Sequence, residues 1–392
     1  MRKKQRRNRE NMKILIYEWN GFCQRDLKEI LRAQGHSVER IGYVVKEKCA
    51  DRFFEEKLAE RLKKGYDCVV SFNFYPSVAL CCRDAGILYL SWIYDGEDFG
   101  LYHTAVHYET NRIFPFDSSM AARLRVRGAK HVWYLPLGAN LKRLDALSLS
   151  EEEREKYRAD VSFIGNLYQN KISLDQYQYP PYVKGFLEGA IQAQEKINTS
   201  LFLEDMLTEK DIEAMAEKIP AMDKRYTIKP RDMVLTLLTT SVTKRERFHI
   251  MKELSEHFTV DLYTYSDTQG LPQIRRHGTI SYFADMPKLF RCSKINLNIT
   301  HRMIRTGIPL RVIDVLGAGG FLMSNYQQDM GEDFRDGENL AVYYSLEDLC
   351  EKAAFYLEHD EERARIAANG RQLAEEKFSL EDCAAAMLRA AF

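Results

Sequence analysis

The sequence predicts an α/β fold in which two Rossmann-like domains face a cleft, with a helical insertion in the second domain. Apolar strand segments alternate with amphipathic helical segments from Lys13 to Leu135, and the alternation resumes at Asp160. Such alternation indicates parallel strands that are covered by helices on both faces. The length of 392 residues also exceeds what one hydrophobic core usually organises, so at least two domains are expected.

The composition limits which kinds of molecule the protein is expected to bind. Hydrophobic residues make up 45% of the chain, and 57 basic residues balance 57 acidic ones. No overall charge therefore attracts nucleic acid or an anionic membrane. No apolar run approaches the ~20 residues that span a bilayer. We expect a cytoplasmic protein with no nucleic-acid partner and no transmembrane segment, and the sequence gives no signal for an oligomeric state.

The cysteines and the basic N-terminus carry no clear site. The eight cysteines are scattered and form no C-x-x-C pair, which predicts buried thiols and neither a disulfide framework nor a zinc site. Residues 1–11 are rich in arginine and lysine and nearly without apolar side chains, which predicts a disordered tail. A nucleic-acid-binding arm is the alternative, but a mobile extension suits so short a run better.

The first Rossmann-like domain is predicted to cover residues 12–147. Its strands are expected at 13–17, 38–41, 68–72, 87–92, 112–116 and 131–135. Its helices are expected near 24–33, 51–64 and 118–127, with a further short helix that opens at Pro76. Right-handed crossovers place the loops that follow these strands at one edge of the sheet.

Three of these loops, at 18–21, 73–76 and 93–100, carry polar residues beside aromatic ones. Aromatic faces stack on sugars, although such residues also simply cap cores. Asp95 is the candidate general base, because a carboxylate whose pKa is raised by partial burial can take a proton from a hydroxyl. His103 is the second catalytic candidate, and Glu97 and Asp98 are rivals near the same loop.

The second Rossmann-like domain is predicted to cover residues 148–378. Ser150 is expected to cap a charged helix at its start. Gly165 and Asn166 end a strand that begins at Asp160, and they are binding candidates or, equally well, a tight strand-to-helix turn. Residues from about 170 to 241 are helical by periodicity and form the predicted insertion. Its role has no signature in the sequence.

Lys244 and Arg245 are predicted to open the next helix. Cations at a helix start oppose the helix dipole, so their presence indicates an anionic ligand. A solvated run of charges is the commoner explanation.

The pattern of apolar and polar residues over 294–325 predicts a strand, a loop, a helix from Pro309 and a second strand that ends at Asn325. A basic loop that leads into a helix N-terminus suits an anion, because the backbone N–H groups add to the side-chain charges. Arg302, Arg305 and Arg311 suit phosphates in particular, and Asp314 lies on the same helix face as Arg311. The two could equally form an ordinary surface ion pair.

Two groups of motifs carry a resemblance to a known family. In the second half these are Gly307-Ile-Pro-Leu-Arg-Val-Ile-Asp-Val-Leu-Gly-Ala-Gly-Gly-Phe-Leu, Gly331-Glu-Asp-Phe and Gly337-Glu-Asn. In the first half they are Ser91-Trp-Ile-Tyr-Asp95, Phe114-Pro-Phe-Asp117 and Tyr134-Leu-Pro-Leu-Gly-Ala-Asn140. Together they resemble the glycosyltransferases similar to the spore maturation protein CgeB.

The resemblance implies a GT-B fold with a group 1-type C-terminal domain and transfer of a sugar from a nucleotide-sugar donor, UDP- or GDP-linked. The first domain would hold a glycan or protein acceptor, and the second would hold the donor. Asp314 occupies the place of an acidic residue that contacts the donor ribose, although glutamate is commoner there. This chain also has Gly96-Glu97 where the family more often has a small residue and proline after the aspartate.

The family fold further implies that the last helix, residues 379–392, packs back on the first domain. It implies donor contacts from Gly165, Asn166, Lys244, Arg245 and Asn325. No Asp-x-Asp cluster is present, so neither a metal ion nor another cofactor is expected. A nucleotide-sugar epimerase on the same scaffold, and a non-catalytic spore or surface protein that retains the fold, are the two alternatives.

Overall fold

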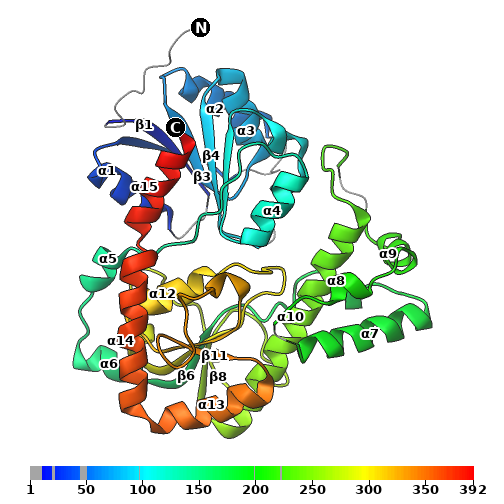
Figure 1. Cartoon of the computed structure of the whole chain (residues 1–392), viewed down its shortest axis with the longest axis vertical. Helices are drawn as coiled ribbons and strands as arrows, with labels where there is room; N and C mark the ends of the chain where they lie inside the picture. Colours follow the sequence, from blue (N-terminus) through cyan, green and yellow to red (C-terminus); the bar gives the residue numbers. More distant parts are fainter. Residues whose placement is uncertain (1–10, 20–22, 45–50, 97, 198, 221–222) are drawn as a thin grey trace.

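The computed structural model describes residues 11–19, 23–44, 51–96, 98–197, 199–220 and 223–392. Two α/β units are stacked along the long axis of the molecule, and a group of helices lies beside the second unit (Figure 1). This is the predicted architecture. Nearly all of the predicted basic tail lies outside the described residues, as do Glu97 and part of the loop at 18–21.

The first unit is built on a five-stranded parallel sheet in the order β2-β1-β3-β4-β5. Alternate residues of β1 pack into separate cores: Ile14 and Ile16 face one side of the sheet, and Leu15 and Tyr17 face the other. The strand is apolar throughout because both faces are covered. The strands are β1 Lys13–Glu18, β2 Ser37–Gly42, β3 Cys68–Phe72, β4 Leu88–Ile93 and β5 Asn111–Pro115.

The helices of this unit begin close to their predicted starts. They are α1 Gln24–Ala33, α2 Arg52–Leu62, α3 Pro76–Ala85 and α4 Ser118–Val126, with the short 3-10 helices η1 Phe99–Tyr102 and η2 Thr104–His107. The predicted strand at 131–135 is wrong. Only an isolated bridge joins Val132 to Ile113 there, and the segment then leaves the sheet toward the second unit.

The second unit has a six-stranded parallel sheet in the order β11-β10-β9-β6-β7-β8. The strands are β6 Ala159–Ile164, β7 Val260–Tyr263, β8 Arg275–His277, β9 Ser293–Asn298, β10 Leu322–Asn325 and β11 Ala341–Tyr343. After β6 the chain first builds one half of the sheet and then returns to β9 on the other side. Ligands of open α/β sheets bind at such a switch point, outside the carboxyl ends of the strands.

The helices of the inserted segment share an apolar core of their own that includes Leu187, Leu235 and Leu238. They are η3 Leu174–Gln176, α7 Pro181–Glu195, α8 Leu203–Met206, α9 Glu209–Ala216 and the first half of α10 Pro230–His257. Residues 225–227 of this segment contact the first unit, and we call them the strap. Thr104 N donates to Arg225 O (3.0 Å), and Thr227 N donates to Tyr102 O (2.7 Å).

The prediction that Lys244 and Arg245 open a helix is wrong. Helix α10 has 28 residues and begins at Pro230, so both residues lie far inside it. Proline suits a first helical turn, and no glycine or proline interrupts the chain between Pro230 and His257. The argument from the helix dipole therefore does not apply to these two side chains.

The chain crosses between the units twice, and the two crossings lie side by side. Ala139 N donates to Phe378 O (2.9 Å), and Leu380 N donates to Ala139 O (3.0 Å). A Cβ on Gly138 would lie 2.7 Å from Leu380 Cα, so the close approach requires glycine. The remaining helices are α5 Leu141–Asp145, α6 Glu151–Lys156, α11 Met286–Cys292, α12 Leu310–Ala318, η4 Gln328–Met330, α13 Leu346–Glu358, α14 Asp360–Lys377 and α15 Leu380–Ala391.

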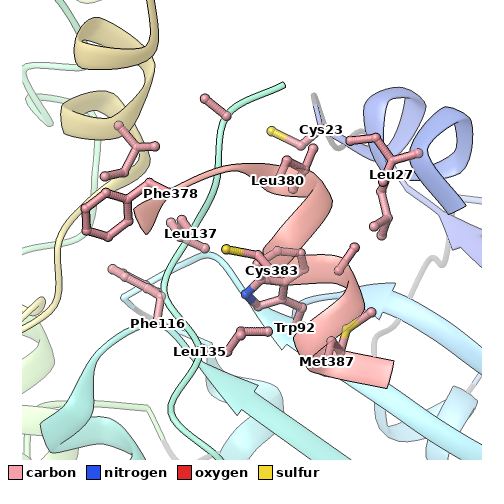
Figure 2. Close-up of a cluster of buried hydrophobic side chains, with 14 of the residues drawn as sticks. Cys23, Leu27, Trp92, Phe116, Leu135, Leu137, Phe378, Leu380, Cys383 and Met387 are labelled. Atoms are coloured by element: carbon pink, nitrogen blue, oxygen red, sulfur yellow. The ribbon is translucent and has the colours of Figure 1, made fainter. Parts of the chain in front are cut away.

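Helix α15 lies on the first unit although it is the last segment of the chain (Figure 1). Cys383 and Met387 of α15 face Trp92 and Leu135 of the first unit, and Leu380 lies near Cys23 (Figure 2). These side chains belong to one buried cluster that extends into both units. Separating the two units would expose these apolar side chains to water. Their burial therefore stabilises the observed arrangement of the units.

Candidate active site

A cleft of about 770 Å³ lies between the carboxyl edges of the two sheets and the inserted helices. The loop after β4 contributes one wall, the loops after β6 and β9 contribute another, and α10 closes one side. The lining residues are Tyr94, Asp95, Gly96, Phe99, Asn166, Tyr168, Lys171, Ile172, Tyr177, Ile219, Pro220, Met233, Thr236, Leu237, Thr240, His301 and Ile304. A partly apolar concave site with a few convergent polar groups is typical of a ligand-binding site.

Asp95 lies on the wall contributed by the first unit, where its side chain is exposed to the cleft. Asn73, at the end of β3, holds it in place. Asn73 Nδ2 donates to Asp95 Oδ2 (2.6 Å), and Asn73 Oδ1 accepts the N–H groups of Tyr94 (2.9 Å) and Asp95 (3.1 Å). Asn73 has a φ of 61°, in the left-handed region that asparagine tolerates better than most residues. The prediction that Asp95 is partly buried is wrong, because it stands at the cleft surface.

The opposite wall combines the ends of β6 and β9, which flank the switch point. Asn166 follows β6, and its Oδ1 accepts Ser266 Oγ–H (2.9 Å) and Tyr168 N–H (2.5 Å). His301 follows β9 and packs edge-on against Tyr168, with ring centroids 4.8 Å apart. Lys171 adds a cation to the same wall. Of the two predicted binding residues in the loop after β6, Asn166 lines the cleft. Gly165 instead makes room for the ring of Phe163, because a Cβ on Gly165 would lie 2.8 Å from Phe163 Cζ.

His301 is neutral. Burial, helped by the nearby charges of Arg247, Lys171 and Arg302, lowers its pKa to about 3. Its Nδ1 accepts the N–H of Met303 (3.1 Å), so the ring proton is on Nε2. The imidazole of His301 is therefore neutral, with its proton on Nε2, at every physiological pH.

Arg247 of α10 fixes both halves of this wall from behind. Its Nη1 donates to Asn166 O (2.7 Å) and its Nη2 to Ile299 O (2.5 Å), so one guanidinium joins the loops after β6 and β9. Its Cζ also lies 5.0 Å from the centroid of the Tyr168 ring. The sequence showed Arg247 as one more cation in a charged run, and nothing local distinguished it from Lys244 and Arg245.

Asp117 joins the two units across the edge of the cleft. It lies between β5 and α4 and caps α4, where its Oδ1 accepts Met120 N–H (2.7 Å). Its Oδ2 accepts three consecutive N–H groups of the second unit, from Arg305 (2.8 Å), Thr306 (3.1 Å) and Gly307 (3.2 Å). Next to it, Ser118 N donates to Asp329 Oδ2 (2.9 Å). The capping role is readable from the sequence, but the contact with the distant loop is not.

The electrostatics of Asp117 follow from these contacts. Burial raises its pKa, but hydrogen bonds from Ser119 and from the Met120 and Thr306 N–H groups outweigh burial, and the resulting pKa lies below the ordinary value. The carboxylate is therefore charged and held by dipoles of both units. Gly307 is required beside it, because a Cβ there would lie 2.8 Å from Asp117 Cα.

His103 is not among the described residues that line the cleft. It is buried under the strap, where it pairs with Tyr226 in an isolated bridge. Its Nδ1 accepts Ala105 N–H (3.0 Å), which caps η2. Burial, assisted by Arg225, lowers the pKa of this histidine. The structure thus gives His103 a role in joining the inserted segment to the first unit.

Three predicted phosphate ligands are engaged with carboxylates. Arg302 forms a buried two-point ion pair with Glu246 of α10 (2.9 and 2.6 Å). Arg305 Nη1 lies 2.5 Å from Glu204 Oε2. Arg245 pairs with Glu188 and, at 3.2 Å, with Glu195. Together with Lys244, Arg245 lines a separate groove of about 410 Å³ between α7 and α10.

Arg311 and Asp314 form the i,i+3 ion pair that was the alternative reading, with Nη1 and Oδ2 3.5 Å apart. Asp314 is buried, and its Oδ1 accepts Tyr282 O–H (2.9 Å). Burial, partly offset by Arg311 and Tyr282, raises its pKa to about 6. Its charge also contributes to raising the pKa of Tyr94, which lines the cleft. Neither Arg311 nor Asp314 is among the described residues that line the cleft.

Asn325, at the end of β10, is buried and holds the base of the central loop. Its Oδ1 accepts Thr300 N–H (2.8 Å), and its Nδ2 donates to Tyr326 O (3.2 Å). It does not line the cleft formed by the described residues. Its contacts position the loop that carries His301.

Other site classes have little support within the described ranges. No group of three or more histidine, cysteine, aspartate and glutamate side chains there is arranged to hold a metal ion. The cysteines that the structure describes carry unpaired thiols. None of the helices in these parts of the chain combines the length and hydropathy that crossing a membrane requires.

Comparisons with known proteins agree with this geometry. Residues 236–389 match a family model described as glycosyl transferase-like. A comparison with curated protein sequences gives no significant match. The fold is similar to that of HepE from Anabaena in complex with UDP and glucose, with 11% identity, a TM-score of 0.54, and coverage of 97% of this chain and 99% of that chain.

Two further structures are similar at the same level. Sucrose-phosphate synthase from Thermosynechococcus elongatus and a glycosyltransferase from Rickettsia africae each share 11% identity, with a TM-score of 0.55 and coverage of 97% of this chain and 98% of theirs. These similarities show the GT-B fold. The matched segment is similar to glycosyl transferases, and the GT-B fold that the sequence predicted is confirmed.

The first prediction concerns Asp117. Asp117→Asn removes a buried charge that accepts N–H groups from both units, and we expect it to lower the free energy of unfolding by roughly 2 kcal/mol or more at pH 7. Because the folded pKa is lowered, this contribution is present above the ordinary aspartate pKa of about 3.9 and is lost as the pH falls through the folded value. Denaturant unfolding from pH 7 to pH 3 measures both effects.

Asp84→Asn, at an exposed aspartate of the same unit, is the matched control and should change stability little. An Asp117→Asn protein that is as stable as the wild type at pH 7 would show that the carboxylate does not hold the units together.

The second prediction concerns Asp314 and has the opposite sign. Its folded pKa of about 6 lies above the ordinary value, so its carboxylate lowers stability once the pH rises through that range. Asp314→Asn keeps the acceptor for Tyr282 without the charge. We expect this variant to exceed the wild type by roughly 2–3 kcal/mol at pH 8, and to match it near pH 4. Unfolding curves at the two pH values test this, and a variant less stable than the wild type at pH 8 would contradict the burial argument.

Proposed function

We propose that this protein transfers a glycosyl group from a UDP- or GDP-linked sugar to a hydroxyl of a glycan, a protein or another cell-surface acceptor. One observation carries the proposal. The cleft combines a positioned carboxylate, Asp95, on the side of the first sheet with polar groups at the switch point of the second sheet. The glycosyl transferase-like match supplies α10 and the loop after β9 on that second side.

The donor diphosphate is proposed to lie near Asn166, Lys171 and His301. As the bond between the sugar and the diphosphate breaks, negative charge develops on the leaving oxygen. The Lys171 ammonium would stabilise that charge in a partly enclosed site, where such interactions are stronger than in water, and the His301 ring lines the same wall. We accordingly propose transfer without a required metal ion.

Asp95 is proposed as the general base. The acceptor oxygen attacks the anomeric carbon, the bond from that carbon to the diphosphate breaks, and Asp95 takes the proton of the acceptor hydroxyl. Asn73 supports this role because it orients both the carboxylate and the backbone of Asp95. A base that is held by a second side chain loses little entropy when it reaches the geometry for proton transfer.

Asp314 is proposed to contact the donor ribose. Its hydrogen bond with Tyr282 O–H is one that a ribose hydroxyl could replace. A buried carboxylate with a raised pKa destabilises the folded protein, and groups of this kind are concentrated at functional sites. Loss of nucleotide affinity together with a gain in stability would therefore distinguish a binding role from a structural one.

We further propose that the protein is a CgeB-like transferase and acts in the cytoplasm. The motifs around Asp95 and Asp314 support the family. The unpaired thiols of the described residues suit a reducing compartment.

The proposal is tested by a thermal-shift screen against nucleoside diphosphates and their sugars, since a ligand that binds only the folded state raises its stability. We expect one nucleotide to stabilise the wild type selectively and Asp314→Asn to weaken that effect. Asp95→Asn should keep the nucleotide shift but lower sugar transfer by roughly 10²–10⁴-fold.

Asp84→Asn serves as the control and should transfer sugar at the wild-type rate. Full activity of Asp95→Asn would remove Asp95 as the base. A folded protein that no nucleotide stabilises would favour a fold retained without catalysis.

A further inference from the structure

A small chamber opens beside the cleft between α4, η1 and α10. Its free volume is about 40 Å³. One ordered water requires about 10–15 Å³ on this measure, so the chamber has room for a group of the size of a phosphate or carboxylate. Gly96, Phe99 and Thr236 line both the chamber and the cleft. The two spaces are therefore contiguous, and they meet next to Asp95.

Three arginines line this chamber: Arg123, Arg127 and Arg305. We call it the arginine chamber. Arg123 Nη1 donates to the neutral Ser119 Oγ (2.8 Å), and the Arg127 guanidinium lies over the Tyr102 ring, 4.0 Å from its centroid. Within the described residues, neither of these two arginines forms an ion pair. Arg305 has an ion pair with Glu204 at one end, but its buried Nε finds no hydrogen-bond partner in the part of the chain that the structure describes.

The carboxylates that line the chamber do not neutralise these arginines. Asp98 accepts the N–H groups of Phe74 (2.6 Å) and Gly100 (3.0 Å). Asp232 lies in the first turn of α10, and no ion pair between described residues joins it to Arg123 or Arg127. Burial and then the charge of Arg305 lower the pKa of Arg123, as expected when two cations share a partly dry space, and the charges of Asp117 and Glu204 offset this only in part. An anion between the two arginines would relieve this repulsion.

We propose that the arginine chamber binds an anionic group of the acceptor, a phosphate or a carboxylate. The inference rests on the proposed transferase activity, and it restricts the acceptor to a charged class. Arginine binds both groups through paired N–H donors. The chamber is built mainly from the first unit, on the Asp95 side of the cleft, and is distinct from the β6–β9 switch point where the donor is proposed to bind. An anion held here would therefore place the rest of the acceptor at the base.

The test uses inorganic phosphate as the probe and the full chain saturated with the nucleoside diphosphate that it binds, so that the donor site is already filled. Isothermal titration should detect phosphate binding to this complex. Arg127→Gln and Arg123→Gln should each weaken phosphate binding about tenfold or more, because each removes a charge-assisted contact. Lys130→Gln removes an exposed cation near α4 that does not line the chamber, and it should leave phosphate affinity unchanged.

Arg127→Lys separates a phosphate-binding role from a packing role, since lysine keeps the charge but stacks less well on Tyr102. It should bind phosphate more tightly than Arg127→Gln because the charge is kept, but less tightly than the wild type because lysine lacks the paired donors. Melting temperatures check that each variant is folded. If Arg127→Gln does not fold, Arg123→Gln and Arg127→Lys still decide.

Two results would overturn the proposal: phosphate that fails to bind once nucleotide is present, or phosphate affinity that is equal in the wild type and the folded glutamine variants. If no nucleotide binds, the proposed transferase function fails separately, and the same titration without nucleotide still tests the chamber.

Discussion

The cleft depends on one carboxylate that belongs to neither sheet. Asp117 caps α4 in the first unit and accepts the N–H groups of Arg305, Thr306 and Gly307 in the second. These N–H groups belong to the loop that carries His301, so the hydrogen bonds that join the units also fix one wall of the site. Helix α15 and the strap at Thr227 reinforce the same arrangement from two other directions. A cleft held at three places keeps its two walls at a defined separation.

Several charged or titratable side chains in and near this site lower the stability of the folded protein. Asp314 is buried with a raised pKa, and His301 is held neutral. Arg123 and Arg305 line one small chamber beside the cleft, where the charge of Arg305 helps to lower the pKa of Arg123. Strictly structural positions seldom carry such groups, because apolar side chains of similar size would be more stable there. His301 lines the cleft, and Arg123 and Arg305 line the chamber beside it, which supports the proposal that charged ligands bind there.

The sequence predicted much of the fold because its signals are local. Helix α1 begins and ends where its periodicity indicated, and Ser150 caps α6 as expected. The strands β8 and β11 were missed because each has only three residues, too few for a periodic pattern. The prediction that a helix begins at Lys244 was wrong, because the long, threonine-rich segment before it does not show clearly where a helix starts.

The candidate site was predictable in part, for a related reason. Asp95 and Asn166 were found because they follow strands, and parallel strands bring such residues to one edge. The sequence predicts Arg302 and Arg305 as phosphate ligands because it cannot show that Glu246 and Glu204 lie opposite them. Asp117 and Arg247 were missed for the same reason, since their partners are far away in the chain. Residue type indicates what a side chain can bind, and only the fold decides what it meets.

A structure of the protein with a bound nucleoside diphosphate would test the account most directly. The account predicts the diphosphate between the ends of β6 and β9, within hydrogen-bond distance of Lys171 and His301, with space for the sugar toward Asp95. A nucleotide found instead in the groove between α7 and α10, against Lys244 and Arg245, would contradict the proposed donor site. Lys244 and Arg245 would then be the phosphate ligands.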